Sequence, residues 1–371
     1  MKVSRRRPSC CWNKRNLLPD HWRRAALSPP TAWGEPLGSG ILRSTPEDFE
    51  VEEILGFEAG GVGPHALLRV RKRGANTEWV ARELARAAGC KPFDVGFAGL
   101  KDRNAVTTQH FTVPRGKRAA EEFVGIGGEG YEVLSSAPHQ RKLPRGALEG
   151  NRFAITVRGL ACDPDALAGR IQELARGGAP NYFGAQRFGR DAGNLALVLE
   201  TAGKLAQGER PRSRGRPAQG FMLSAARSVV FNAILAERIA AKSWNTLEVG
   251  DVANLDGRGS VFAADPADAD LATRCAALDV HPTAPLWGEG AELSQGEIRA
   301  LEERVAAGFP EVLAVIGQER MKSERRALRI RVRDLVHEYQ DGILRLTFSL
   351  SSGSFATTVL REIIMAADTG E

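Results

Sequence analysis

The sequence FAGLKDRNAVTTQHFTV, Phe97–Val113, places a charged, glycine-punctuated loop between two strand-like runs. After the loop, Phe111 alternates with polar neighbours, as expected of a half-buried strand. Gly99 lets the main chain turn and lets another molecule approach it closely. Asp102 lies between two cations in this loop, and a carboxylate in that setting is suited to act as a nucleophile or base. We therefore take Asp102 as the candidate catalytic group.

The same loop has simpler interpretations when it is considered alone. A solvated charged turn is common, and few such turns are active sites. A phosphate-cradling loop would need Gly-Lys-Ser/Thr at the start of a helix, whereas Leu100 precedes Lys101 and Asp102 follows it. The choice between a catalytic loop and a solvated turn therefore depends on the rest of the chain.

Length and charge distribution limit the class of protein. With 371 residues the chain can form two domains, or one domain with a large insertion. Eight basic residues and one acid in residues 1–24 contribute +7 to the formal net charge of +6, so the rest of the chain sums to −1. Binding of nucleic acid by the body of the protein must therefore come from clustered charge.

The patterns of cysteine, histidine and apolar residues favour neither a metal site nor a membrane protein. The five cysteines show no C-x-x-C spacing and the six histidines complete no ligand set with them, which predicts reduced thiols, no metal and no cofactor. No apolar run approaches the length of a membrane span, and no hydrophobic segment follows the basic residues of the start. We expect a cytoplasmic protein.

Residues 1–32 mix Arg, Pro, Ser and Trp without helical or strand periodicity. We expect them to form a basic extension that is poorly ordered. Basic and aromatic side chains of this kind could contact RNA, although an extension without a structural role is the simpler interpretation.

Strands and helices alternate in the first half of the chain. The run 65–73, HALLRVRKR, alternates as a strand does, and Gly89 ends the helical pattern that follows it. A second strand and helix occupy 150–178, with Asp163 in the N-cap position. These units predict a β, α, β order around the Asp102 loop.

The C-terminal part of the chain returns to strand patterns after a helical, loop-rich middle. Asp341-Gly342 is a hairpin signal that joins two alternating runs. A helix over 355–365 is expected to close the chain. The fold class is therefore α/β (α+β), and the middle is an insertion if the two ends share one sheet.

Basic side chains cluster in three stretches, 141–145, 210–216 and 320–333. A fourth stretch, PNYFGAQRFGR, interleaves aromatic residues with arginines. Planar side chains can stack on bases while arginines bind phosphate. The candidates for contact with an RNA backbone are Arg141, Lys142, Arg145, Arg187, Arg212, Arg214 and Arg326.

Several stretches together resemble the TruD family of pseudouridine synthases, which isomerise a uridine in transfer RNA. The resemblance runs from about Leu37 to the C-terminus and leaves residues 1–32 outside it. Val62 and Pro64 depart from the family's usual Gly-Glu-Gly-Glu-His. The matching motifs, in the family's order, are TPEDFEVEE, GANT, FAGLKDRNAVTTQ, GNRF, PNYFGAQRFGR, SAARSVVFN and GSFATTVLRE.

The resemblance implies a mixed, largely antiparallel catalytic sheet with an inserted α/β TRUD domain. The implied division is a catalytic domain over 33–178, an inserted domain over 179–328 and a catalytic return over 329–371. The two lobes would form a cleft for folded RNA. The resemblance implies uridine 13 of tRNA as the substrate, no cofactor and no obligatory protein partner, so that a monomer is expected.

The resemblance also assigns residues to roles. Asp102 would be the nucleophile, with Lys101 and Arg43 in supporting positions. Four further residues would hold the flipped uridine, namely Phe49, Asn151, Phe153 and Phe355. Aromatic walls can trap a freed base by stacking, and an amide can bond to its edge.

Two other functions fit the residues less well. A non-catalytic RNA-binding or RNA-chaperone protein could use the same basic and aromatic positions. A metal-independent hydrolase of nucleosides or phosphoesters could use Asp102 as a base. The first would not depend on Asp102, and the second would release free uracil or cut the strand.

Overall fold

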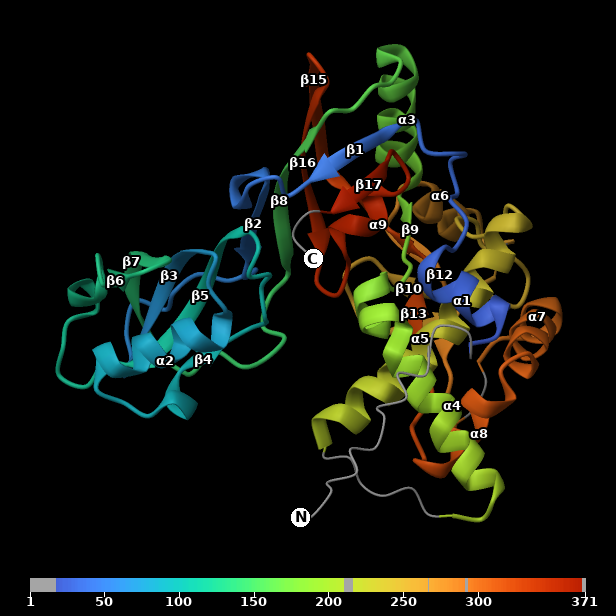
Figure 1. Cartoon of the computed structure of the whole chain (residues 1–371), viewed down its shortest axis with the longest axis horizontal. Coiled ribbons are helices and arrows are strands. Elements are labelled where there is room, and N and C mark those ends of the chain that lie inside the picture. The colour runs from blue at the N-terminus through green and yellow to red at the C-terminus, as the bar shows by residue number, and fades with distance from the viewer. Residues whose placement is uncertain (1–17, 210–215, 266, 291–292, 369–371) are drawn as a thin grey trace, which may run out of the picture.

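The computed structural model describes residues 18–209, 216–265, 267–290 and 293–368 (Figure 1). Its largest element is an 11-stranded sheet with the central order β15-β16-β8-β2-β5-β3-β7-β6. Two neighbouring pairs in this sheet, β2 with β5 and β1 with β17, are parallel, and the other pairs are antiparallel. The predicted mixed, largely antiparallel sheet is confirmed.

The strands of this sheet come from both ends of the described chain. They are β1 (Ser39–Leu42), β2 (Phe49–Ile54), β3 (His65–Arg73), β4 (Gly96–Phe97), β5 (Val106–Pro114), β6 (Gly127–Gly128), β7 (Tyr131–His139), β8 (Gly150–Arg158), β15 (Arg333–Gln340), β16 (Ile343–Ser351) and β17 (Met365–Asp368).

Two groups of helices cover different parts of the sheet (Figure 1). The helix α2 (Thr77–Ala88) packs its apolar side on β3 and β5, with Leu68, Leu84 and Phe111 in the core between them. Helices α3 (Pro164–Gly177) and α9 (Ala356–Leu360) cover the part formed by β8 and β16. The α3 helix begins as predicted, because Asp163 accepts hydrogen bonds from two main-chain amides of its first turn.

The middle of the chain leaves and rejoins the sheet at one place. There β9 (Ala179–Pro180) pairs antiparallel with β14 (Arg329–Ile330). The part covered by α2 and the part between β9 and β14 lie on opposite sides of β2 and β8 (Figure 1). We therefore propose residues 179–328 as a lobe inserted into the catalytic fold.

The inserted lobe combines helices with a four-stranded antiparallel sheet of order β11-β10-β12-β13. Its elements are α4 (Gly193–Ala206), α5 (Arg216–Ala240), β10 (Val252–Leu255), β11 (Val261–Ala263), α6 (Ala269–Ala276), β12 (Val280–Leu286), α7 (Gly296–Ala307), α8 (Pro310–Gln318) and β13 (Glu324–Ala327). Within α5, the stretch Ala218–Ala240 is long and apolar enough to cross a membrane, but 67% of its most apolar window is buried inside the molecule.

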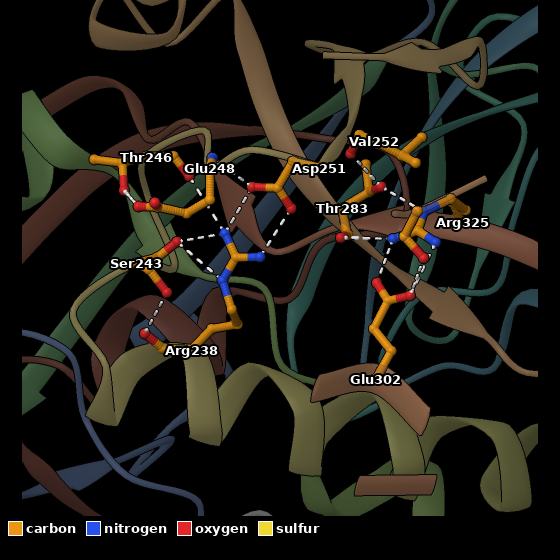
Figure 2. A network of polar contacts seen from close by, with 10 residues as sticks. Arg238, Ser243, Thr246, Glu248, Asp251, Val252, Thr283, Glu302 and Arg325 are labelled. Carbon is orange, nitrogen blue, oxygen red and sulfur yellow. Dashed lines mark hydrogen bonds and ion pairs between the residues drawn. The ribbon is translucent and has the colours of Figure 1, made fainter. Parts of the chain in front are cut away.

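Two buried ion pairs brace the inserted lobe (Figure 2). Arg238 in α5 binds both oxygens of Asp251 over 2.8 Å and donates to the Ser243 carbonyl. Arg325 on β13 binds Glu302 of α7 over 2.5 Å. The first pair ties α5 to the residue before β10 and the second ties β13 to α7, so the polar groups help to fix how the helices lie against the small sheet.

The prediction that residues 1–32 are poorly ordered is wrong for residues 18–32, while residues 1–17 lie outside the described part. Residues Asp20–Leu27 form helix α1, whose Trp22 is fully buried. Trp22 stacks on Phe309 with ring centroids 5.6 Å apart, and Asn232 donates to the Ala25 carbonyl over 2.8 Å. The apolar residues of α1 recur at helical spacing, but the surrounding arginines and prolines conceal that pattern.

The predicted helix over 355–365 is also wrong in part. It ends at Leu360, and Met365–Asp368 form β17, which pairs parallel with β1. This pairing could not be read from the local sequence, since the partner strand is more than 300 residues away.

Candidate active site

A pocket of about 420 Å³ opens beside the loop between β4 and β5. The seven residues predicted for catalysis and for holding the base all line it, namely Arg43, Phe49, Lys101, Asp102, Asn151, Phe153 and Phe355. They come from four separate stretches of the chain. The structure thus brings the predicted residues into one cavity, and their individual roles stay predictions.

The Asp102 side chain is held at the edge of this pocket. One carboxylate oxygen lies 3.1 Å from the Arg43 guanidinium. The other accepts a hydrogen bond of 2.9 Å from the Asn104 amide. About a third of the side chain stays exposed, at 34%. The carboxylate is therefore oriented by two partners and still accessible to a ligand.

Hydrogen bonds to polar side chains of β3, α2 and β5 hold the main chain of the Asp102 loop. Thr77 accepts a hydrogen bond from the Lys101 amide over 3.0 Å and donates to Gln109 over 2.9 Å. The Lys72 ammonium donates to the main-chain carbonyl of Asp102 over 2.8 Å. The loop therefore has a fixed main-chain position independent of its charged side chains.

Lys72 is a site residue that the sequence reasoning did not select. It is 1% exposed, and burial lowers the pKa of its ammonium to about 8, although nearby Asp102 acts in the opposite direction. The alternation of β3 could have indicated this residue, since position 72 falls on the same buried strand face as Leu68 and Val70. A lysine on the buried face of a strand needs a specific set of partners.

Lys101 does not contact Asp102 through its side chain. Its ammonium binds buried Glu53 over 2.7 Å, and Glu53 also accepts from the His110 amide over 3.0 Å. Burial alone would raise the pKa of Glu53, but the contacts with His110 and Lys101 outweigh it and lower that pKa. Glu53 is a second supporting residue that the sequence patterns did not single out. It could have been noticed because it is an acid on the same buried face of β2 as Phe49 and Val51.

The pocket has aromatic walls and one unsatisfied polar edge. Phe49 and Phe153 lie edge to face with ring centroids 6.2 Å apart, and the Arg43 guanidinium lies 4.1 Å above Phe49. The side-chain oxygen of Asn151 is buried and has no hydrogen-bond partner among the described residues. Phe355 also lines the cavity. This arrangement can hold a planar ring by stacking and bond to one polar edge.

The inserted lobe also reaches the pocket. Gln186, from the short helix Ala185–Phe188, lines the cavity. Arg326 of the inserted lobe donates to the Gly353 carbonyl over 3.1 Å, two residues before Phe355. Both lobes therefore contribute to the geometry of one site.

The predicted RNA-backbone residues lie in different environments. Arg141 is exposed, Lys142 donates to the Phe93 carbonyl, and Arg145 lies 3.6 Å above the Phe97 ring. Arg212 and Arg214 lie outside the described residues.

Arg187 and Arg326 are partly buried and both lie against Phe183. Burial, with repulsion from Arg187, lowers the pKa of Arg326 to about 9. Arg326 also donates to the main-chain carbonyl of Asn181 over 3.3 Å. Arg326 is thus built into the contact between the lobes through Gly353, whereas Arg187 donates to Ser224 within the inserted lobe.

A family model described as tRNA pseudouridine synthase D (TruD) matches residues 32–201 and 216–363. The chain belongs to this family. A tRNA pseudouridine synthase D from Xanthomonas axonopodis pv. citri is 42% identical over 352 residues, covering 92% of this chain and 95% of the relative. One from Methylococcus capsulatus is 44% identical over 337 residues, covering 90% and 94%.

A solved structure supports the fold of the TruD family for this chain. It is described as that of tRNA pseudouridine synthase D from Methanosarcina mazei and superposes with a TM-score of 0.70. The identity is 22%, with 94% of this chain and 98% of that chain covered. Among the described residues of the present chain, no group of three or more His, Cys, Asp and Glu side chains could hold a metal ion.

Proposed function

We propose that this protein isomerises a uridine of transfer RNA to pseudouridine, and that uridine 13 is the target. The observation that carries the proposal is the Asp102 carboxylate in one pocket with three phenylalanine rings and the unsatisfied Asn151 oxygen. A pyrimidine ring has a flat face that can stack on an aromatic wall and polar edges that can bond to an amide.

The reaction requires few groups. The C1′–N1 bond breaks, the uracil turns within the pocket, and a C1′–C5 bond forms. The C5 proton is lost and N1 gains a proton, so the reaction is an isomerisation without a co-substrate. Asp102 can begin it by attacking C1′ or by removing a sugar proton, and both routes need the carboxylate at the pocket edge.

The pocket can also retain the detached base. Phe49 and Phe153 are buried, and both line the pocket together with Phe355. Stacking on this aromatic wall holds the uracil while it turns. Asn151 would then bond to one edge and limit the orientations available to the base.

Access to the uridine requires base flipping, which costs a few kcal/mol of lost stacking and pairing. Contacts with phosphates supply compensating affinity. Arg141 and Arg145 are both exposed, and Arg145 directly precedes Gly146, which lines the pocket. A backbone running past this edge would place its phosphates near these cations.

The test is the substitution Asp102→Asn, with exposed Asp165→Asn on α3 as the matched control. Pseudouridine formation would be followed by release of tritium from [5-³H]uridine in a tRNA transcript. We expect loss of tritium release by Asp102→Asn with tRNA binding retained, and activity close to that of the unchanged protein for Asp165→Asn.

Other outcomes separate the competing functions. Full activity of Asp102→Asn would exclude the carboxylate mechanism. Release of free uracil, or strand cleavage, would indicate a hydrolase. Mapping pseudouridine in tRNA from cells with and without the protein tests uridine 13, because a loss at another position alone would contradict that site.

A further inference from the structure

A second hollow lies next to the catalytic loop, outside the pocket described above. Its volume is about 590 Å³, within the usual range for ligand sites of about 300–1,000 Å³. It is formed by the end of β3, the start of α2, the catalytic loop and the turn before β7. Its lining residues are Arg73, Gly74, Ala75, Asn76, Trp79, Arg82, Arg103, Glu129 and Gly130.

The lining of this hollow is predominantly basic. Arg73 is paired with Glu47 over 2.5 Å, and Arg103 uses one nitrogen to bond the Gly74 carbonyl over 3.2 Å. Arg82 is exposed and has no hydrogen-bond or ion-pair partner among the described residues. Glu129 is the single acid among the lining residues. Arg82 and the remaining nitrogens of Arg103 are therefore available to an anion.

An aromatic side chain lines the same hollow. Trp79 is half-buried, and its ring lies edge to face with Tyr131 at a centroid distance of 5.8 Å. This contact holds the indole in one orientation. An aromatic ring beside arginines is the usual combination for a nucleotide, since the ring stacks on the base and guanidinium groups bind the phosphate.

The hollow and the catalytic loop share one anchor. The Lys72 ammonium donates to the Ala75 carbonyl over 2.9 Å and to the Asp102 carbonyl over 2.8 Å. Ala75 lines the hollow, and Arg103, which also lines it, directly follows Asp102. The hollow is therefore within reach of a nucleotide that neighbours a uridine placed at Asp102.

We propose that the hollow binds one nucleotide of the RNA substrate beside the flipped uridine. Arg82 and Arg103 bind its phosphate, and Trp79 stacks on its base. This inference rests on the proposed function, because it needs an RNA strand at Asp102. It adds an RNA contact that none of the basic clusters recognised in the sequence contains.

The test compares Arg82→Ala with Arg86→Ala. Both changes remove one arginine from α2, but Arg86 binds Glu83 over 2.7 Å and does not line the hollow. The dissociation constant for a labelled tRNA transcript would be measured over a range of salt concentrations. We expect Arg82→Ala to weaken binding about three- to tenfold at low salt and to flatten the salt dependence by about one phosphate contact. Arg86→Ala should stay within about twofold of the unchanged protein.

Equal affinities and salt slopes for the two variants would overturn the proposal. Thermal melting of both proteins checks the fold, and Arg82→Lys should recover part of the lost affinity if charge is the cause. A second measurement replaces the tRNA by free AMP. If Arg82→Ala weakened the binding of AMP but left the affinity for tRNA unchanged, the proposal would also be overturned. Tritium release by the unchanged protein tests the proposed function separately.

Discussion

The Lys72 ammonium donates a hydrogen bond of 2.8 Å to the main-chain carbonyl of Asp102 and another of 2.9 Å to that of Ala75. A third carbonyl, of Lys101, lies 3.5 Å away. Three acceptors around one buried ammonium fix the main chain on both sides of the candidate nucleophile. Lys72 is thus a positioning residue, since its contacts are with the main chain of the loop rather than with the ligand pocket.

Replacing Lys72 by Met should lower kcat more than it raises KM. The apolar side chain fills similar space but leaves the carbonyls of Ala75 and Asp102 without their donor, so the loop moves. A displacement of about 1 Å at a reacting group can cost about 100-fold in rate. We expect a 10- to 100-fold loss, measured by tritium release at saturating tRNA. Exposed Lys117→Met is the control, and an unchanged kcat for Lys72→Met would contradict the positioning role.

The stability contributed by Lys72 should depend on pH. The ordinary pKa of 10.5 is lowered to about 8 in the folded protein, because burial disfavours the charged form. Between pH 8 and pH 10.5, the unfolded chain binds more protons than the folded protein does, so the free energy of unfolding rises as the pH rises. The maximum gain is about 3 kcal/mol.

Urea unfolding at pH 7 and pH 9.5 would measure this effect. Relative to Lys72→Met, the unchanged protein should have a higher free energy of unfolding at pH 9.5 than it has at pH 7. A difference that is constant between the two values would show that the ammonium keeps an ordinary pKa. Lys117→Met again serves as control, since its side chain is exposed.

The sequence predicted the residues of the pocket better than it predicted what supports them. Asp102, Phe49 and Asn151 belong to short motifs, so a family resemblance was enough to select them. Lys72 and Glu53 act through contacts with residues 30 and 57 positions away. Local alternation shows only that such a side chain is buried, and the partner that makes burial tolerable is set by strand pairing.

The same limit explains the error in the N-terminal segment. Helix α1 is eight residues long, too short to be stable alone, and it forms because Trp22 and its neighbours pack on the inserted lobe. Strand β17 likewise exists only through β1. Elements that have strong local signals, such as α3 with its Asp163 cap, were predicted correctly.

Replacing Asp251 by Asn should destabilise the inserted lobe. The Asp251 side chain is completely buried and that of Arg238 is 2% exposed, so the substitution leaves a buried guanidinium without its counter-charge (Figure 2). Breaking such a pair from one side typically costs about 3–5 kcal/mol. The free energy of unfolding in urea would measure the loss.

A surface pair gives the comparison for Asp251→Asn. Glu303 lies 2.8 Å from Arg299 one turn away on α7, and both side chains are about half exposed. Glu303→Gln should change the free energy of unfolding by no more than about 0.5 kcal/mol. Similar effects of the two substitutions would mean that water reaches the Arg238–Asp251 pair.

Replacing Trp22 by Ala should weaken the whole inserted lobe although the residue lies outside it in sequence. Trp22 is fully buried, packs on Phe309 and belongs to the same apolar core as Phe231 of α5. Removing a buried tryptophan side chain costs about 3–5 kcal/mol because a cavity remains. Thermal unfolding would measure the loss, and Arg24→Ala on the same helix is the control. If residues 18–32 were only an appendage, Trp22→Ala and Arg24→Ala would melt at the same temperature as the unchanged protein.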